Sequence, residues 1–265
     1  MISPYAHIHP KAQIGKDAII DPFAVIEDEV IIGEGTHIMS HAVILQKVTV
    51  GKSCKIFPGA VIGAIPQDLK FDGEDTVVQI GNNTTVRECV TINRGTKDKW
   101  KTVIGSDCLL MAYSHIAHDC IIGDHVIIAN SVQLGGHVEI GDYATIGGMA
   151  AAIQFSKIGA HTYIAGGTEI IKDIPPYIKA GRSPLSYAGV NSVGLQRRGF
   201  PSEKINNISE IYRNIYLRGL NISQATTLIE KEFPDSEEKK EILKFIKESS
   251  RGILKISSKE IKDEN

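Results

Sequence analysis

The sequence predicts a mainly β protein: a left-handed parallel β-helix of hexapeptide repeats, followed by a small C-terminal α-helical domain. Two observations carry this prediction. An aliphatic residue returns every six positions between Ile8 and Ile170, and from about Ser202 the apolar spacing becomes that of amphipathic helices. We therefore expect the β-helix over residues 1–184 and the helical domain over residues 185–265.

The period of six is the stronger observation. Of the 28 positions reached from Ile8 in steps of six, 24 are Ile, Val or Leu. This period fits neither a helix nor an alternating strand, but it fits a strand of four or five residues followed by a tight corner. Three such hexads close a triangular coil, and coils stack in parallel at about 4.8 Å. The aliphatic side chains then form three ladders inside the prism.

The other phases of the repeat agree with this packing. The residue after the aliphatic one is often glycine, and the fourth residue after it is small or β-branched. Three of the four cysteines, Cys54, Cys108 and Cys120, occupy that small slot, so we expect them to be buried apolar side chains. The fourth is Cys89, and no C-x-x-C pair suggests a disulfide framework or a cysteine zinc site.

Two polar segments, residues 64–79 and 97–103, interrupt the repeat, which then recovers its phase. We interpret them as loops extruded from a continuing coil, and loops on a rigid scaffold commonly carry function. The repeat ends at Pro175 and Pro176. Ser202 and Asn221 resemble helix starts, Gly219 and Gly252 resemble stops, and the final ISSKEIKDEN is expected to fray.

Composition excludes several classes of protein. A chain with 42% hydrophobic residues is not disordered, and a net charge of −2 provides no overall basic field for nucleic acid or a membrane surface. We find no signal peptide and no apolar run of the ~18 residues that a membrane helix requires, so we expect a cytoplasmic protein without stable membrane insertion.

Residues separated by three hexads should lie above one another on adjacent coils. Two neighbouring columns then contain several residue types that commonly take part in catalysis or binding. One column holds His118, Gly136 and Gln154, and the other holds Asp119, His137 and Phe155. His115 lies around the corner of the same coil as His118. This patch is the candidate site.

A histidine of near-neutral pKa is the usual base for activating a hydroxyl, and a neighbouring carboxylate can orient it. We therefore expect His118 as general base, Asp119 as its support, and the backbone N–H of Gly136 as an oxyanion donor. The sequence has no G-x-S-x-G elbow, so we expect direct transfer without a covalent enzyme intermediate. It also has no Walker loop and no G-x-G-x-x-G, and we expect no cofactor. We expect the His118 imidazole on the outside of the prism, where truncation leaves no cavity.

Two other interpretations stay open. Three histidines (His115, His118 and His137) could hold zinc, as in the γ-class carbonic anhydrases, which use the same scaffold. A non-catalytic structural solenoid is the second alternative.

The sequence is similar to the UDP-N-acetylglucosamine O-acyltransferases, enzymes of the first step of lipid A biosynthesis. The resemblance covers nearly the whole chain. It rests on the repeats and on the blocks QDLKF, HIAHDC, GGMAAAIQF, DIPPY, GVNSVGLQRRGF and RGIL. It implies a homotrimer with its site between neighbouring solenoids. It also implies transfer of a (3R)-3-hydroxyacyl chain from acyl carrier protein to the 3-hydroxyl of UDP-N-acetylglucosamine.

The resemblance assigns roles to further residues. His118 would be the base, with Asp119 and Gly136 in the roles given above. The substrate cleft would be lined by His115, His137, Gln154, Asp68 and Lys70. The nucleotide and its phosphates would contact Asn191, Arg197 and Arg198, since an arginine fork pairs with phosphate oxygens. Gly166 would sit where a side chain limits acyl length, and glycine there predicts a long chain.

Three positions depart from the family pattern: Asn93 and Ile153 replace histidines expected to line the cleft, and Val193 replaces a glutamate near the nucleotide. Some relatives acylate a 3-amino sugar instead, which is an alternative here. We also expect the C-terminal region to dock the acidic acyl carrier protein through a local excess of positive charge, supplied by Arg197, Arg198, Lys204, Arg213 and Arg218.

Overall fold

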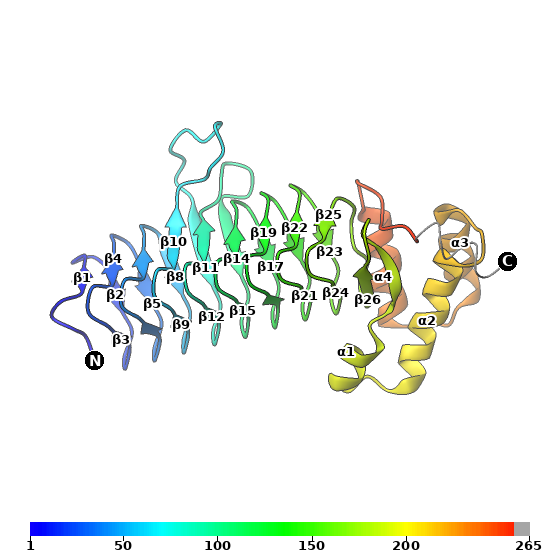
Figure 1. Cartoon of the computed structure of the whole chain (residues 1–265), viewed down its shortest axis with the longest axis horizontal. Coiled ribbons are helices and arrows are strands. Elements are labelled where there is room, and N and C mark those ends of the chain that lie inside the picture. Colours follow the sequence, from blue (N-terminus) through cyan, green and yellow to red (C-terminus); the bar gives the residue numbers. More distant parts are fainter. Residues whose placement is uncertain (257–265) are drawn as a thin grey trace.

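The computed structural model describes residues 1–256 and confirms the predicted fold class. An elongated prism of stacked coils runs from the N-terminus to about residue 181, and helices follow it at the far end (Figure 1). The tail expected to fray lies, from residue 257 on, outside the described residues. The domain boundary expected at residue 184 stays a prediction; it falls between strand β26 (Ile178–Gly181) and strand β27 (Ser186–Val190).

Three sheets form the sides of the prism. The first sheet contains β1 (His7–Ile8), β4 (Val25–Ile26), β7 (Val43–Ile44), β10 (Val61–Ala64), β13 (Thr91–Asn93), β16 (His115–Ile116), β19 (Gln133–Leu134), β22 (Ala151–Ala152) and β25 (Glu169–Ile170). The second contains β2 (Gln13–Ile14), β5 (Ile31–Ile32), β8 (Val48–Val50), β11 (Val77–Ile80), β14 (Lys101–Ile104), β17 (Ile121–Ile122), β20 (Glu139–Ile140) and β23 (Lys157–Ile158).

The third sheet contains β3 (Ile19–Ile20), β6 (His37–Ile38), β9 (Lys55–Ile56), β12 (Thr85–Val86), β15 (Leu109–Leu110), β18 (Ile127–Ile128), β21 (Thr145–Ile146), β24 (Tyr163–Ile164), β26 (Ile178–Gly181) and β27 (Ser186–Val190). The named strands pair in parallel except β26 with β27, which are antiparallel. Most strands have only two paired residues, shorter than the expected four or five, because the corners consume the rest of each hexad.

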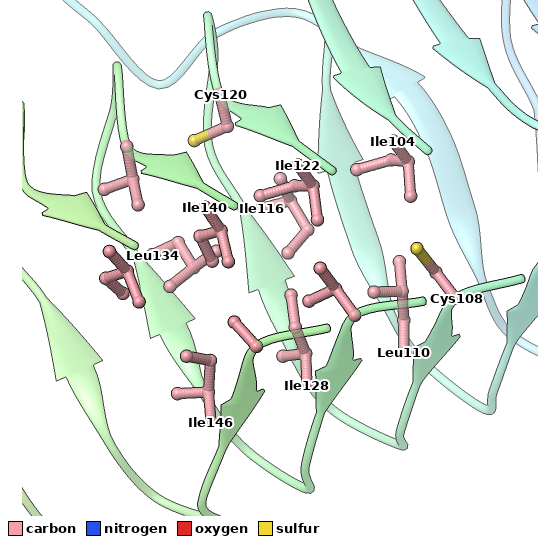
Figure 2. Packing of buried hydrophobic residues seen from close by; sticks show 14 of the residues in the cluster. Ile104, Cys108, Leu110, Ile116, Cys120, Ile122, Ile128, Leu134, Ile140 and Ile146 are labelled. Atoms are coloured by element: carbon pink, nitrogen blue, oxygen red, sulfur yellow. The ribbon is translucent and has the colours of Figure 1, made fainter. Parts of the chain in front are cut away.

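The stepped aliphatic residues form the core, as predicted. Ile104, Ile122 and Ile140 make a ladder on the second sheet that faces Leu110 and Ile128 on the third (Figure 2). These side chains are at most 3% exposed. Cys54, Cys108 and Cys120 are buried in the same core as expected, and Cys89 is exposed.

We name the corners by the sheets they join. Corner 1 leads from the first sheet to the second, corner 2 from the second to the third, and corner 3 from the third back to the first. Glycine begins corner 2 in coil after coil. A Cβ on Gly105 would lie 2.5 Å from Oδ1 of Asp124, an atom that accepts a 2.6 Å hydrogen bond from the Ser106 N–H. Glycine therefore leaves room for the side chain that ties one coil to the next.

Both loops leave the prism at corner 1 (Figure 1). Uninterrupted coils pair residues three hexads apart, as Ile26 does with Ile44. At the loops Ile62 pairs with Ile92, and Ile92 with Ile116. The first loop therefore adds two hexads to its coil, and the second adds one. Their boundaries differ from the predicted ones: loop 1 is residues 65–76 and loop 2 is residues 94–100. The strands are longer here because β11 and β14 pair over four residues.

Four helices follow: α1 (Ser192–Arg197), α2 (Ser202–Tyr216), α3 (Ile222–Glu232) and α4 (Glu237–Glu248). Asn221 caps α3 in a reciprocal capping box with Gln224, as its position predicts. The predicted start at Ser202 is confirmed, because α2 begins at Ser202, directly after its cap residue Pro201. The short helix α1 was not predicted. Of the helices in the described chain, none is long and apolar enough to cross a membrane.

Candidate active site

The predicted columns exist at corner 1. The N–H of His137 donates to the carbonyl of His118, and the N–H of Phe155 donates to the carbonyl of Gly136, both at 3.0 Å. Asp119, His137 and Phe155 have left-handed backbone angles, with φ of 60°, 63° and 64°. Such angles disfavour non-glycine residues and recur where a corner fixes the backbone. This repeated turn stacks the His137 ring on Phe155, with ring centroids 4.3 Å apart.

His118 and Asp119 form a hydrogen-bonded pair. Nδ1 of His118 lies 2.8 Å from Oδ2 of Asp119. A carboxylate only accepts, so this contact places the proton of a neutral imidazole on Nδ1 and leaves Nε2 as a base. His118 is 5% exposed. The expectation that its truncation leaves no cavity is therefore wrong: the ring lies outside the coil but is covered by its neighbours.

Asp119 is fully buried and saturated with donors. Besides His118, it accepts hydrogen bonds from the N–H of Thr96, the hydroxyl of Thr96 and the N–H of Lys99. Burial raises the pKa of Asp119, but these hydrogen bonds outweigh burial and bring the pKa below its ordinary value. The carboxylate is therefore held as an anion beside the imidazole.

His137 lies between two carboxylates. Its Nδ1 is 3.0 Å from Oδ2 of Asp98, and its Nε2 is 3.8 Å from Oδ2 of Asp119. Its ring meets the ring of His118 edge-on, with centroids 5.0 Å apart. The arrangement gathers His118, Asp119 and His137 into one compact group, as the column argument predicts.

His115 lies apart from this group. It projects from β16 on the outer face of the first sheet, and its Nδ1 is 2.7 Å from the hydroxyl of Thr91. Burial, with a smaller contribution from His118, lowers the pKa of His115. Gln154, the third residue of the His118 column, is exposed.

A histidine zinc site fits these residues poorly. His118, Asp119 and His137 place ligand atoms within 4.8 Å of one another, but His115, the third histidine of that prediction, is not among them. Oδ2 of Asp119 already accepts from Thr96 and faces Nδ1 of His118. The carboxylate oxygen of this group is therefore already occupied by internal hydrogen bonds.

Loop 1 carries Asp68 and Lys70 on the same corner. Oδ1 of Asp68 accepts from the N–H of Lys70, and Lys70 is exposed. Loop 1 is held from below by Arg94, whose guanidinium lies 5.4 Å from the centroid of the Phe71 ring.

The three departures from the family pattern lie in different surroundings. Asn93 does not line an open cleft: it is 3% exposed, and its amide donates to the carbonyl of Ile65 at 3.0 Å. The other two, Ile153 and Val193, are exposed.

The remaining predicted residues lie on other corners. Asn191 caps α1 by accepting from the Gly194 N–H, and it donates to the carbonyl of His161 at corner 2. Arg198 also turns to corner 2, where it donates to the carbonyl of Tyr143 at 2.8 Å and lies over the Tyr143 ring. Arg197 is exposed on α1.

Gly166 lies at corner 3 and is exposed. Within one prism, His118, Arg198 and Gly166 therefore lie on three different corners.

Three residues of the site were not predicted from the sequence: Thr96, Asp98 and Lys99. All three belong to loop 2, where the insertion breaks the register that located the others. The available signal was weak: a polar loop interrupts the coil directly before the one that bears His118.

The fold and the site together define a class: a hexapeptide-repeat acyltransferase built on a left-handed β-helix. Residues 101–136 match the bacterial transferase hexapeptide family, and residues 173–254 match the second domain of UDP-N-acetylglucosamine O-acyltransferases. An acyl-[acyl-carrier-protein]–UDP-N-acetylglucosamine O-acyltransferase of Aquifex aeolicus is 52% identical over 75% of this chain and 77% of its own. One from Chlorobaculum parvum is 50% identical over 73% and 74%.

Solved structures agree over nearly the full length. The UDP-N-acetylglucosamine acyltransferase of Bacteroides fragilis matches 96% of this chain and all of its own, with 49% identity and a TM-score of 0.95. That of Francisella novicida matches 98% and 96%, with 37% identity and a TM-score of 0.95. The chain belongs to the acyl-[acyl-carrier-protein]–UDP-N-acetylglucosamine O-acyltransferase family, and it is an acyltransferase.

Proposed function

We propose that this chain transfers a (3R)-3-hydroxyacyl group from acyl carrier protein to the 3-hydroxyl of UDP-N-acetylglucosamine, the first step of lipid A biosynthesis. The observation that carries the proposal is the His118–Asp119 pair, in which the 2.8 Å contact directs Nδ1 inward and leaves Nε2 to a substrate. Family membership supports both substrates, because the relatives are named for them.

The step needs one base and one oxyanion donor. Nε2 of His118 takes the proton from the sugar hydroxyl while its oxygen attacks the thioester carbonyl carbon. The negative charge passes to the carbonyl oxygen, which the N–H of Gly136 faces; no backbone carbonyl in residues 1–256 accepts from that N–H. The tetrahedral species then expels the carrier thiolate, which receives the proton from His118. The new ester bond replaces the thioester, and the enzyme returns to its starting state.

We further propose that the site is completed in a homotrimer. His118, Arg198 and Gly166 are the predicted base, phosphate contact and acyl-length position, but they occupy corners 1, 2 and 3 of one prism. One substrate can reach all three only if corners from neighbouring prisms meet. Apolar side chains exposed on the outer faces suit packing of this kind; examples are Ile19, Ile31 and Tyr163.

A cytoplasmic location forms part of the same proposal. The four cysteines are unpaired, and disulfides are rare in reducing compartments.

Product analysis tests the substrates. The purified protein is given a mixed pool of acyl carrier protein thioesters with UDP-N-acetylglucosamine in one reaction and its 3-amino analogue in another, and products are identified by mass spectrometry. An O-acylated nucleotide sugar is expected. Acylation only of a 3-amino sugar would identify the alternative acceptor, and no product from any thioester would favour a structural role.

His118→Ala tests the base and should lower kcat at least ~100-fold, the low end for general-base catalysis. Because the side chain is buried, His118→Gln is a second variant that fills the space, and the melting temperature is recorded for both. His41→Ala, which removes an exposed histidine at corner 3, is the matched control and should keep wild-type kcat. A folded His118 variant with near-normal turnover would overturn the assignment.

A further inference from the structure

Loop 2 contacts the site through three of its residues. Thr96 bonds to Asp119 through both its N–H and its hydroxyl, and Asp98 faces His137. Lys99 reaches Asp119 with its N–H. No other loop segment of the described chain places donors on the Asp119 carboxylate. Apart from His118, loop 2 is therefore the only part of the described chain that donates side-chain or backbone hydrogen bonds to this carboxylate.

The Thr96 hydroxyl makes the shortest of these contacts, 2.6 Å to Oδ2 of Asp119. Oδ2 is the same oxygen that faces Nδ1 of His118. The hydroxyl also accepts from the N–H of Asp98 at 3.3 Å, so its own proton is directed to the carboxylate. Thr96 is 8% exposed and Asp119 is fully buried, which leaves little room for water to replace the hydroxyl.

Orientation of His118 depends on this oxygen. A carboxylate can turn about its last bond, and an imidazole bonded to one of its oxygens turns with it. A charge-assisted hydrogen bond from a buried hydroxyl fixes Oδ2 in the direction that Nδ1 requires. We propose that Thr96 is a positioning residue for the transfer reaction: its hydroxyl fixes the Asp119 oxygen that orients His118. This inference rests on the proposed function, because it requires His118 to be the base.

The surrounding contacts make the hydroxyl separable from the loop. The N–H groups of Thr96 and Lys99 remain as donors to Asp119 when only the side chain changes. The ammonium of Lys99 also stays bonded to Glu139 at 2.6 Å, which anchors the far end of loop 2 to β20. Replacement of the hydroxyl by a methyl group of similar size removes the acceptor of the Asp98 N–H, but these remaining contacts should keep the loop backbone in place.

The experiment compares Thr96→Val with Thr96→Ser under saturating substrates. Thr96→Val should lower kcat about tenfold and change either KM by less than about twofold, because orientation of the base affects the chemical step. Thr96→Ser keeps the hydroxyl and should therefore have a kcat within about twofold of wild type. Thr36→Val is the control for loss of a buried hydroxyl: Thr36 is fully buried and donates to Gly51, far from corner 1. It should lower the melting temperature and leave kcat unchanged.

A double variant separates positioning from stability. If Thr96 acts through His118, Thr96→Val should have no further effect on the residual rate of His118→Ala. An additional tenfold loss in that background would overturn the inference, as would a Thr96→Val enzyme with wild-type kcat. If His118→Ala keeps wild-type turnover, the proposed role of His118 as base is wrong. That measurement does not depend on any Thr96 variant, so the two failures can be told apart. If Thr96→Val does not fold, the Thr96→Ser enzyme still decides, because a serine enzyme tenfold slower than wild type contradicts a role for the hydroxyl.

Discussion

The ring of His118 lies directly against the backbone of Gly136, in a space that no side chain could share. A Cβ on Gly136 would lie 2.5 Å from Cε1 and 2.6 Å from Nε2 of His118. Both are edge atoms of the imidazole, and Nε2 is the atom proposed to take the proton from the sugar hydroxyl. Glycine at this position therefore leaves the room in which the proposed base sits.

Gly136→Ala should move the imidazole without removing it. We expect kcat to fall by at least ~100-fold, because displacement of the base by even an ångström removes a productive geometry. The N–H of residue 136 persists in alanine, so a loss of activity reports displacement of the ring. Gly181→Ala is the matched control, since its Cβ would make only an ordinary 3.7 Å contact with Ala165. A Gly136→Ala enzyme with wild-type kcat would show that the His118 ring has space elsewhere.

A second prediction concerns pH and His161. His161 is stacked between Tyr143 and Tyr177 at corner 2, with ring centroids 4.9 Å and 5.5 Å away. Burial and, to a lesser extent, the charge of Arg198 lower its pKa to about 4, from an ordinary value near 6.5. Between these two values the unfolded chain binds the proton and the folded chain does not. Stability contributed by neutral His161 is thus complete above about pH 6.5 and is lost as pH falls through about 4.

His161→Phe keeps an aromatic ring in the stack and removes the titration. Urea unfolding of both proteins from pH 4 to pH 7.5 gives the difference in free energy of unfolding, wild type minus variant. That difference should rise with pH up to about 6.5 and then stay level. Glu241, whose pKa is raised mainly by burial, contributes the opposite trend in both proteins and cancels in the difference. Parallel stability curves would contradict the prediction.

Residues in the regular hexapeptide coils could be placed from the sequence, and residues in the two loops could not. Because every uninterrupted coil is three hexads long, the burial of Ile122 and the stacking of His118 under Gly136 could be deduced by counting. Residues in the loops could not be placed, since an insertion of one or two hexads has no counterpart in the neighbouring coils. Thr96 is the clearest case: nothing in its local sequence indicates that it donates to a carboxylate 23 positions later.

The C-terminal residues show a second limit. Motif likeness selected Asn191 and Arg198, but it could not show that Asn191 caps α1 or that Arg198 lies over Tyr143. A long polar side chain has several possible hydrogen-bond partners within reach, and tertiary packing determines which of them it contacts. Asn93 is similar: its position is that of a cleft residue in the family pattern, but its amide anchors loop 1.

Charge near the helices leads to a prediction about the acyl donor. Of the five basic residues expected to dock acyl carrier protein, Lys204 pairs with Glu238 at 2.7 Å and Arg213 with Glu210 at 3.4 Å. Arg218 is exposed, and no ion pair is found for it in residues 1–256. Arg218→Gln should therefore raise KM for the donor and weaken its dependence on salt, with kcat nearly unchanged.

The control is Lys16→Gln, which removes one positive charge from an exposed position at the N-terminal end of the prism, where Lys16 lies 3.9 Å from the likewise exposed Asp17 carboxylate. For the wild-type enzyme, added salt should raise the donor KM more than it lowers kcat. A donor KM that is equal at low and high ionic strength would argue against electrostatic docking here.

Two adjacent glycines at corner 3 are constrained in different ways. Gly167 has a left-handed backbone angle, with φ of 65°, whereas Gly166 does not. The need for positive φ that would explain a glycine thus falls on Gly167. A Cβ on Gly166 would lie 2.7 Å from the carbonyl oxygen of Gly148, so any side chain there requires a small backbone shift. Gly166→Ala measures the stability cost of that shift alone.

The last prediction concerns acyl length. Gly166→Met adds a side chain at the proposed acyl-length position and should shorten the preferred acyl chain by several carbons, since each methylene excluded from a buried site forfeits roughly 0.8 kcal/mol. Gly167→Asn should keep the parental chain length, because asparagine tolerates positive φ and its Cβ meets nothing within 4 Å. Products from a mixed thioester pool are compared by mass spectrometry at a temperature where all three variants are folded. A folded Gly166→Met enzyme with the parental preference would show that this position does not measure the chain.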